Sequence, residues 1–364
     1  MYCILACALV ISLLWGRPTL VAQLPHDGTY LSRGRTSMIN GLFIWIVFMA
    51  HLQTYQSPCT AGDIPVLAVV GRMGQTMVAP FFFFSGYGIM SSLQRKGLAY
   101  SKQLVTQRFS KVLFHFAVAV GLFWAVQYAL GIHYDTLRVL RSLCAWSSIG
   151  NSNWFIFVSL VAYVMIALSY ACLHRWGHTL VVGGVTAAFL GVISLLLPKG
   201  GYWVDSCLCI PAGMLFCLYQ GSVEKKVRAI PCPVWLLGGV VALVGWGLYR
   251  VLTLQLTLHI IGEVPPLMLV LVQNVGCVVF SFGVCFFFAG MRFARTPAFL
   301  VWSGGVGLFY LYIFQRIPML VGKHWGWQVE APLLYQMACA ICTVLVAWGC
   351  CRVFPRVDAC IWRK

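Results

Sequence analysis

His51 ends a long apolar run, NGLFIWIVFMAH, and its imidazole could act as a general base. Imidazole is the side chain best suited to activating a hydroxyl near neutral pH. Asn40 precedes it by 11 residues, close to three helical turns, so the two side chains share one helix face roughly 16 Å apart. Ionisable groups inside a membrane span are costly and are functional candidates by default. A histidine that packs or caps the helix at the membrane interface is the alternative that this pattern leaves open.

A second candidate region is PFFFFSGYGIM at 80–90, where Ser85 and Tyr87 bring polar groups to mid-membrane depth. Its two glycines permit another helix or a ligand to approach the backbone closely. The segment that follows has five basic residues and no acidic one: Arg95, Lys96, Lys102, Arg108 and Lys111. Such a cluster suits an anionic lipid surface or a phosphate-bearing ligand, and the sequence leaves both open.

Polar residues also gather near the expected outer ends of several helices. They are Asn153 and Trp154 in GNSNWFIF, Asp205 in WVDS, and Gln315 and Arg316 in YIFQRIP. We expect Asp205 and Arg316 to pair at the edge of a cavity that His51 faces. Polar and aromatic groups that converge on an outward cavity suit a sugar-like acceptor. Trp154 could instead be an interfacial anchor.

A membrane fold must position these residues. Of the 364 residues, 61% are hydrophobic and 9% are charged, whereas soluble domains carry about 25% charged residues. A span needs roughly 20 mostly apolar residues, and within lipid its backbone must be helical. The sequence therefore predicts an all-α, polytopic integral membrane protein with about ten core transmembrane helices. The stretches lie near 37–56, 76–95, 110–131, 153–172, 179–197, 205–220, 233–252, 267–290, 298–318 and 331–351.

The chain divides into three parts. An apolar helix and basic linker occupy 1–36, a transmembrane domain occupies 37–352, and a basic tail occupies 353–364. Residues 1–15 lack a basic leader, which favours a retained extra helix over a signal-like remnant.

The basic residues predict the orientation in the membrane. With the loops placed on alternate sides, 18 of the 25 Lys and Arg residues fall on one side, so we expect that side and the C-terminus to be cytoplasmic. From an entry near residue 37, the chain reaches His51 after about 21 Å of rise, nearer the outer surface. The net charge of +17 is thus a topology signal, and we expect the lipid bilayer of the plasma (inner) membrane as a partner and no nucleic acid.

The cysteines predict no metal centre. The chain has 16 of them, scattered and mostly inside predicted spans. Cys339 and Cys342 form a CxxC, but within an apolar stretch where small residues at helix contacts explain them. We therefore expect neither a metal site nor a tightly bound cofactor.

Six motifs, taken in order, resemble the acyltransferase family 3 membrane proteins, which O-acetylate cell-surface carbohydrates. They are the helix ending in His51, FFFFSGYGIM, QRFSKVL with Arg108 and Lys111, GNSNWFIF with Trp154, DSCLCIPAGM with Asp205, and LYIFQRIPM. The resemblance covers about residues 30–320. It implies that an acyl donor, usually acetyl-CoA, binds from the cytoplasm as co-substrate. The acceptor, a carbohydrate or lipid-linked sugar, is then modified on the outer side.

The resemblance also implies residue roles. His51 is the catalytic base and Asn40 an orienting or thioester-binding partner, while Arg108 and Lys111 hold the CoA phosphates. Ser85 and Tyr87 border the passage between donor and acceptor. The acceptor side is lined by Asn153, Trp154, Asp205, Gln315 and Arg316.

One position departs from the family pattern. The family has Arg or Lys 11 residues before the histidine, where this chain has Asn40, which cannot neutralise a phosphate. Either Arg35 substitutes in donor binding or activity is weakened, so a catalytically degenerate relative remains an alternative. A glycan or lipid transporter or flippase is another. None of the eight Asp and Glu residues lies in the middle of a predicted span, and no inverted repeat is visible, which disfavours a coupled transporter.

Overall fold

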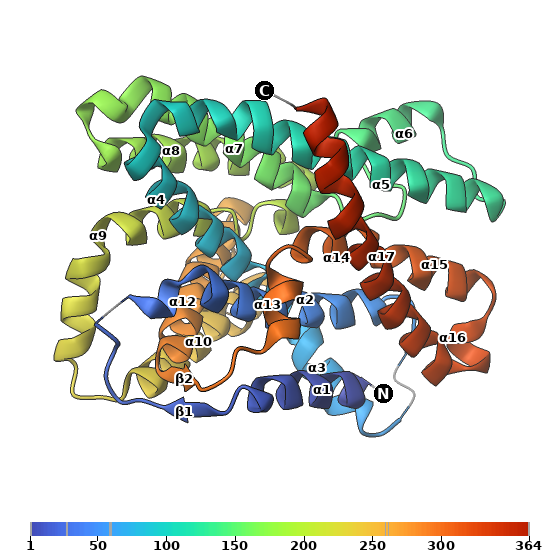
Figure 1. Ribbon diagram of the computed structural model, residues 1–364, viewed down its shortest axis with the longest axis horizontal. Helices are drawn as coiled ribbons and strands as arrows, with labels where there is room; N and C mark the ends of the chain where they lie inside the picture. Colours follow the sequence, from blue (N-terminus) through green and yellow to red (C-terminus); the bar gives the residue numbers. More distant parts are fainter. Residues whose placement is uncertain (1, 27, 58–59, 259, 261, 363–364) are drawn as a thin grey trace.

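The computed structural model describes residues 2–26, 28–57, 60–258, 260 and 262–362. The chain is 80% helical, which confirms the all-α prediction. Its two strands, β1 (Pro18–Leu20) and β2 (Met291–Phe293), form one small antiparallel ribbon in which Pro18 lies opposite Phe293. This ribbon ties the segment after the first helix to a loop near residue 290. It lies at the opposite edge of the molecule from the C-terminus (Figure 1).

The helices fall into two groups by length. The longer ones are α2 (Arg33–Leu52), α4 (Ala79–Gln103), α5 (Ser110–Ala129), α7 (Trp154–Leu173), α8 (His178–Leu196), α9 (Cys209–Ala229), α12 (Pro266–Ala289) and α17 (Pro332–Ile361). The shorter ones are α1 (Tyr2–Trp15), α3 (Asp63–Met73), α6 (Thr136–Leu143), α10 (Val234–Gly247), α11 (Thr253–Thr257), α13 (Ala298–Gly304), α14 (Leu308–Phe314), α15 (Arg316–His324) and α16 (Trp327–Glu330).

Seven helical segments of the described chain are long and apolar enough to cross a membrane. An eighth is added if α13 and α14–α15, which meet at a bend of 67°, count as one broken span. The predicted count of ten is therefore not confirmed. One reason is that α3, α4 and α5 run together as one helical segment, Asp63–Ala129. Another is α9, whose second half is too polar to pass as a span because it carries Glu224, Lys225, Lys226 and Arg228.

The described chain has a helix near each end. The short apolar helix that the sequence favours at residues 1–15 forms as α1. At the other end, α17 continues past the predicted boundary at 352 to Ile361, so most of the basic tail extends the last span.

Helix α2 carries His51 and is held by the broken span. Its first turn begins at Ser32, whose side chain accepts a hydrogen bond from the Arg35 amide (3.4 Å). A Cβ atom on Gly41 would lie 1.9 Å from the Leu300 carbonyl oxygen, and one on Gly304 would lie 2.0 Å from the Gly41 nitrogen. The backbones of α2 and α13 therefore touch directly, as small residues allow between membrane helices. After the bend, α14 and α15 contact α2 further along.

Candidate functional site

The His51 imidazole faces the second half of the broken span. Its ring centroid lies 6.1 Å from that of Tyr312 on α14. The imidazole also contacts the Gln315 side chain and lies close enough to the Arg316 guanidinium for an electrostatic interaction. The structure thus brings His51, Gln315 and Arg316 together, as the sequence predicted, at the C-terminal end of α2.

Several buried polar atoms of this cluster lack good hydrogen bonds. His51 Nδ1 and Arg316 Nε have no hydrogen-bond partner among the described residues. The Tyr312 hydroxyl lies beside Ser152, and neither oxygen makes a hydrogen bond of good geometry within the described chain. Buried polar groups are nearly always paired, so a group of unpaired ones marks a place for a polar ligand.

Asn40 lies in the first half of α2, whereas His51 lies in its last turn. Its Oδ1 atom is buried without a hydrogen-bond partner among the described residues, and its backbone packs against Gly304 of α13. The two side chains are separated by about three helical turns, or roughly 16 Å. Asn40 therefore belongs to the same helix as His51 but not to the cluster around the imidazole.

An apolar cavity of about 240 Å³ lies next to this cluster and includes Ser85 in its wall. Tyr312, which faces His51, lines it together with Phe155 of α7. Val112 of α5 also lines it, as does Tyr163, which interacts electrostatically with Arg108. His51 and Arg108 themselves are not part of the wall. The role of Ser85 at a passage between donor and acceptor stays a prediction.

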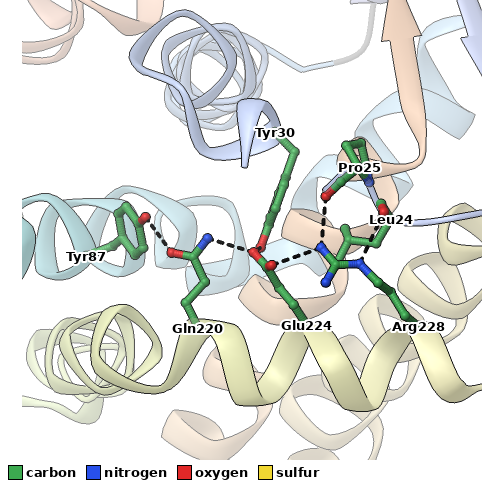
Figure 2. A network of polar contacts seen from close by, with 7 residues as sticks. All are labelled: Leu24, Pro25, Tyr30, Tyr87, Gln220, Glu224 and Arg228. Carbon is green, nitrogen blue, oxygen red and sulfur yellow. Dashed lines mark hydrogen bonds and ion pairs between the residues drawn. The ribbon is translucent and has the colours of Figure 1, made fainter. Parts of the chain in front are cut away.

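Tyr87 points elsewhere. Its hydroxyl donates a hydrogen bond to Gln220 Oε1 of α9 (2.8 Å), as Figure 2 shows. Gln220 in turn donates to Glu224 Oε1 (2.7 Å). Residues two apart on a helix face different directions, so Ser85 faces the cavity while Tyr87 faces α9. Tyr87 therefore does not line the apolar cavity.

The two predicted phosphate-binding residues on the first half of α5 and the turn before it already have protein partners. Lys111 Nζ lies 3.3 Å from Asp358 Oδ2 on α17. The Arg108 guanidinium lies 5.4 Å from the centre of the Tyr100 ring. A cation that pairs with a carboxylate has less to offer a phosphate, so Lys111 is the weaker of the two candidates.

The predicted acceptor-side residues divide into two groups. Gln315 and Arg316 lie at His51, whereas Asn153 donates to the Ala145 carbonyl oxygen (3.0 Å) and braces the loop before α7. Trp154 packs edge-on against Phe82, whose side chain lines the cavity.

The expected pairing of Asp205 with Arg316 is wrong. Asp205 is buried and accepts a hydrogen bond from the Tyr249 hydroxyl (3.1 Å), while its Oδ1 has no partner among the described residues. Burial raises the pKa of the Asp205 carboxyl, which lies in the connection between α8 and α9, to about 8, and the Tyr249 hydrogen bond opposes this shift. The pairing fails because Tyr249 of the π-helical turn after α10 reaches the carboxylate instead.

Sequence reasoning missed Tyr312 and Ser152. Tyr312 lies in the same motif as two predicted residues, and positions 312, 315 and 316 share one helix face. That spacing could have identified it. Ser152 comes from a loop whose path the sequence does not reveal.

No group of three or more His, Cys, Asp or Glu side chains in the described chain is arranged to hold a metal ion. Comparison of the chain with protein-family models, with curated proteins and with solved structures gives no match.

Proposed function

We propose that this chain is a membrane-embedded O-acyltransferase. It moves an acetyl or similar acyl group from cytoplasmic acyl-CoA to a hydroxyl of a carbohydrate or lipid-linked sugar on the outer side of the plasma membrane. The observation that carries the proposal is the imidazole of His51. Its Nδ1 has no hydrogen-bond partner among the described residues, and the ring stands beside Arg316 and faces Tyr312, which lines the apolar cavity. The orientation, with the C-terminus cytoplasmic, rests on the distribution of basic residues.

The reaction follows from these side chains. The neutral imidazole of His51 accepts the proton of the acceptor hydroxyl, and the resulting oxygen nucleophile attacks the thioester carbonyl. The carbonyl oxygen becomes negatively charged, and it would be stabilised by the Tyr312 hydroxyl and Arg316, which lie near His51, and by Ser85, which lines the cavity. When the tetrahedral intermediate collapses, the C–S bond breaks, and CoA leaves as a thiolate that takes the proton from His51. Transfer through an acyl-histidine is a second route with the same residues.

We place the acyl group in the apolar cavity. Its walls are mostly aromatic and aliphatic, contributed by α2, α4, α5, α7 and α14. The phenol of Tyr312 stands between this cavity and the imidazole. An acyl group in the cavity would therefore be separated from the base by the Tyr312 side chain.

The test is acyl transfer by purified protein in lipid nanodiscs. Radiolabelled acetyl-CoA is supplied with surface polysaccharide, peptidoglycan fragments or lipid-linked sugars, and both thiol release and label on the acceptor are measured. His51→Ala should lower the rate by roughly 10²- to 10⁴-fold, the contribution of a general base. His133→Ala, which removes an exposed histidine packed on Tyr128, should leave the rate unchanged. A His51→Ala protein with wild-type activity excludes the proposed role.

A further inference from the structure

A second cavity, of about 400 Å³, lies where α2 begins and is unlike the apolar one. Its walls come from the segment before α2, the first turns of α2, and the β2 strand with the loop that follows. Two arginines, Arg35 and Arg292, line it, together with hydroxyl-bearing residues Thr29, Ser32 and Thr296. We call it the arginine cavity.

Arg35 is held in place with one nitrogen left over. Its Nη2 donates to the Met291 carbonyl oxygen, and its guanidinium lies 4.6 Å from the centre of the Phe293 ring. Its Nη1 is buried and has no hydrogen-bond partner among the described residues. A fixed guanidinium with a buried, unused N–H is prepared to bind an anion, because it gives up little conformational freedom on binding.

The side chains of the arginine cavity that the structure describes include no anion, and position 27, within the segment before α2, lies outside the described residues. None of the described residues that line it is acidic. Two other basic side chains differ in this respect, since Lys111 lies 3.3 Å from Asp358 and Arg228 lies 3.0 Å from Glu224. Phosphate oxygens would supply the negative charge that two arginines require, and hydroxyl groups would complete their hydrogen bonds.

A buried network holds the wall of the arginine cavity that precedes α2 (Figure 2). Tyr30 donates to Glu224 Oε1 (2.8 Å), and Arg228 Nη2 donates both to Glu224 Oε2 (3.0 Å) and to the Pro25 carbonyl oxygen (3.1 Å). Pro25 and Thr29, the neighbour of Tyr30, line the cavity. Glu224 is therefore a positioning residue: it fixes the wall without touching the cavity contents.

We propose that the arginine cavity binds the phosphate groups of the acyl donor, with Arg35 and Arg292 as the ligating cations. This inference rests on the proposed function in taking the donor to be a phosphate-bearing thioester. It moves the phosphates away from Lys111, whose charge Asp358 already meets. The same chemistry would recognise a phospholipid headgroup, so the experiment separates the two sources.

The experiment measures binding to the full-length protein in phosphatidylcholine nanodiscs by calorimetry, with CoA, pyrophosphate and phosphate-free pantetheine as probes. Arg292→Gln and Arg35→Gln should each raise the Kd for CoA and for pyrophosphate by about 10-fold, the effect of losing a charged hydrogen bond. Arg295→Gln is the matched control, because Arg295 lies in the same loop but packs near Trp15 and does not line the cavity.

Phosphatidylglycerol nanodiscs test the lipid source. If phosphatidylglycerol binds in a way that depends on Arg292, while CoA and pyrophosphate do not bind in phosphatidylcholine, the cavity is assigned to lipid headgroups and the donor proposal is overturned. Unchanged CoA and pyrophosphate affinities in Arg292→Gln would also overturn it.

The two proposals can fail separately. If acyl transfer depends on His51 but the KM for the donor is unchanged in Arg292→Gln, the enzyme assignment stands and the arginine cavity is not the donor site. If pyrophosphate binding depends on Arg292 but no acyl transfer occurs, the phosphate site stands and the enzyme assignment falls.

Discussion

His51 and His115 each lie in a helical segment that is long and apolar enough to cross a membrane, and their surroundings are opposite. His115 Nε2 lies 2.9 Å from Asp358 Oδ1, and its Nδ1 lies 3.4 Å from the Tyr310 hydroxyl. Both ring nitrogens are thus occupied, and Phe354 covers the ring. The His51 Nδ1 has no partner among the described residues, and its charged neighbour is Arg316 rather than a carboxylate.

This difference shows how the partners of two histidines in apolar helices distinguish them. A residue-type rule marks both side chains as candidates because both are ionisable and within spans. Their hydrogen-bond partners distinguish them. The His115 ring is held at both nitrogens by a carboxylate and a phenol, and so connects α5, α14 and α17. The His51 ring has a nitrogen without a partner among the described residues, so it can still exchange a proton.

The largest expected effect is on stability, at His115. His115→Ala leaves Asp358 without one of its two partners in a largely buried place, so we expect the free energy of unfolding to fall by about 3 kcal/mol. Acyl transfer per folded molecule should stay unchanged. His51→Ala should do the reverse, with unfolding changed by less than about 1 kcal/mol. Thermal unfolding and activity of the two folded variants, measured side by side, test this. Equal loss of activity in both would end the distinction.

The second expected effect is pH-dependent and compares two carboxylates. Asp358 has basic partners, whereas Asp205 has only Tyr249, and burial raises the pKa of Asp205 to about 8. The folded state therefore holds a proton that the unfolded chain releases above its ordinary pKa of 3.8. Stability should be highest below about pH 4 and should fall as pH rises towards 8, by at most about 1.4 kcal/mol per pH unit.

Unfolding from pH 5 to pH 8, with Asp205→Asn as the comparison, measures this effect. The amide variant should lose most of the slope over this range. Parallel curves for the two proteins would show that Asp205 does not titrate in this way.

The smallest expected effect is at the cation beside His51. Arg316→Gln removes a positive charge near the developing oxyanion, so we expect the transfer rate to fall by about 10-fold, or about 1.4 kcal/mol in activation free energy. Arg316→Lys should restore part of it. Arg72→Gln, an exposed arginine whose side chain bonds its own helix, is the control. A rate that does not change in Arg316→Gln would make Arg316 a structural neighbour only.

The sequence predicts the helices better than their partners. Apolar length places α2, but the helix begins at Arg33 rather than near 37, because Ser32 caps a polar first turn that an apolar window excludes. Likewise, α9 is helical where a span is expected, yet its polar second half serves a buried network rather than lipid.

Within the candidate site, local spacing succeeds and long-range charge matching fails. Gln315 and Arg316 reach His51 as expected, and helix spacing would have added Tyr312 and separated Tyr87 from Ser85. Asp205 could not be placed because two opposite charges in a sequence need not meet. The Asp205 carboxylate is bound instead by the hydroxyl of Tyr249, 44 residues away in the turn that continues α10. The sequence indicates Arg292 only as one of the basic residues that predict the orientation in the membrane. No spacing rule predicts that it lies near Arg35.

The bend of 67° between α13 and α14 separates two helical parts that both contact α2. The close approach of Gly41 and Gly304 fixes the position of α13 on α2, and hence the position of α14, which carries Tyr312. A bulky residue at Gly304 should therefore give a chain that inserts into the membrane but has no acyl-transfer activity.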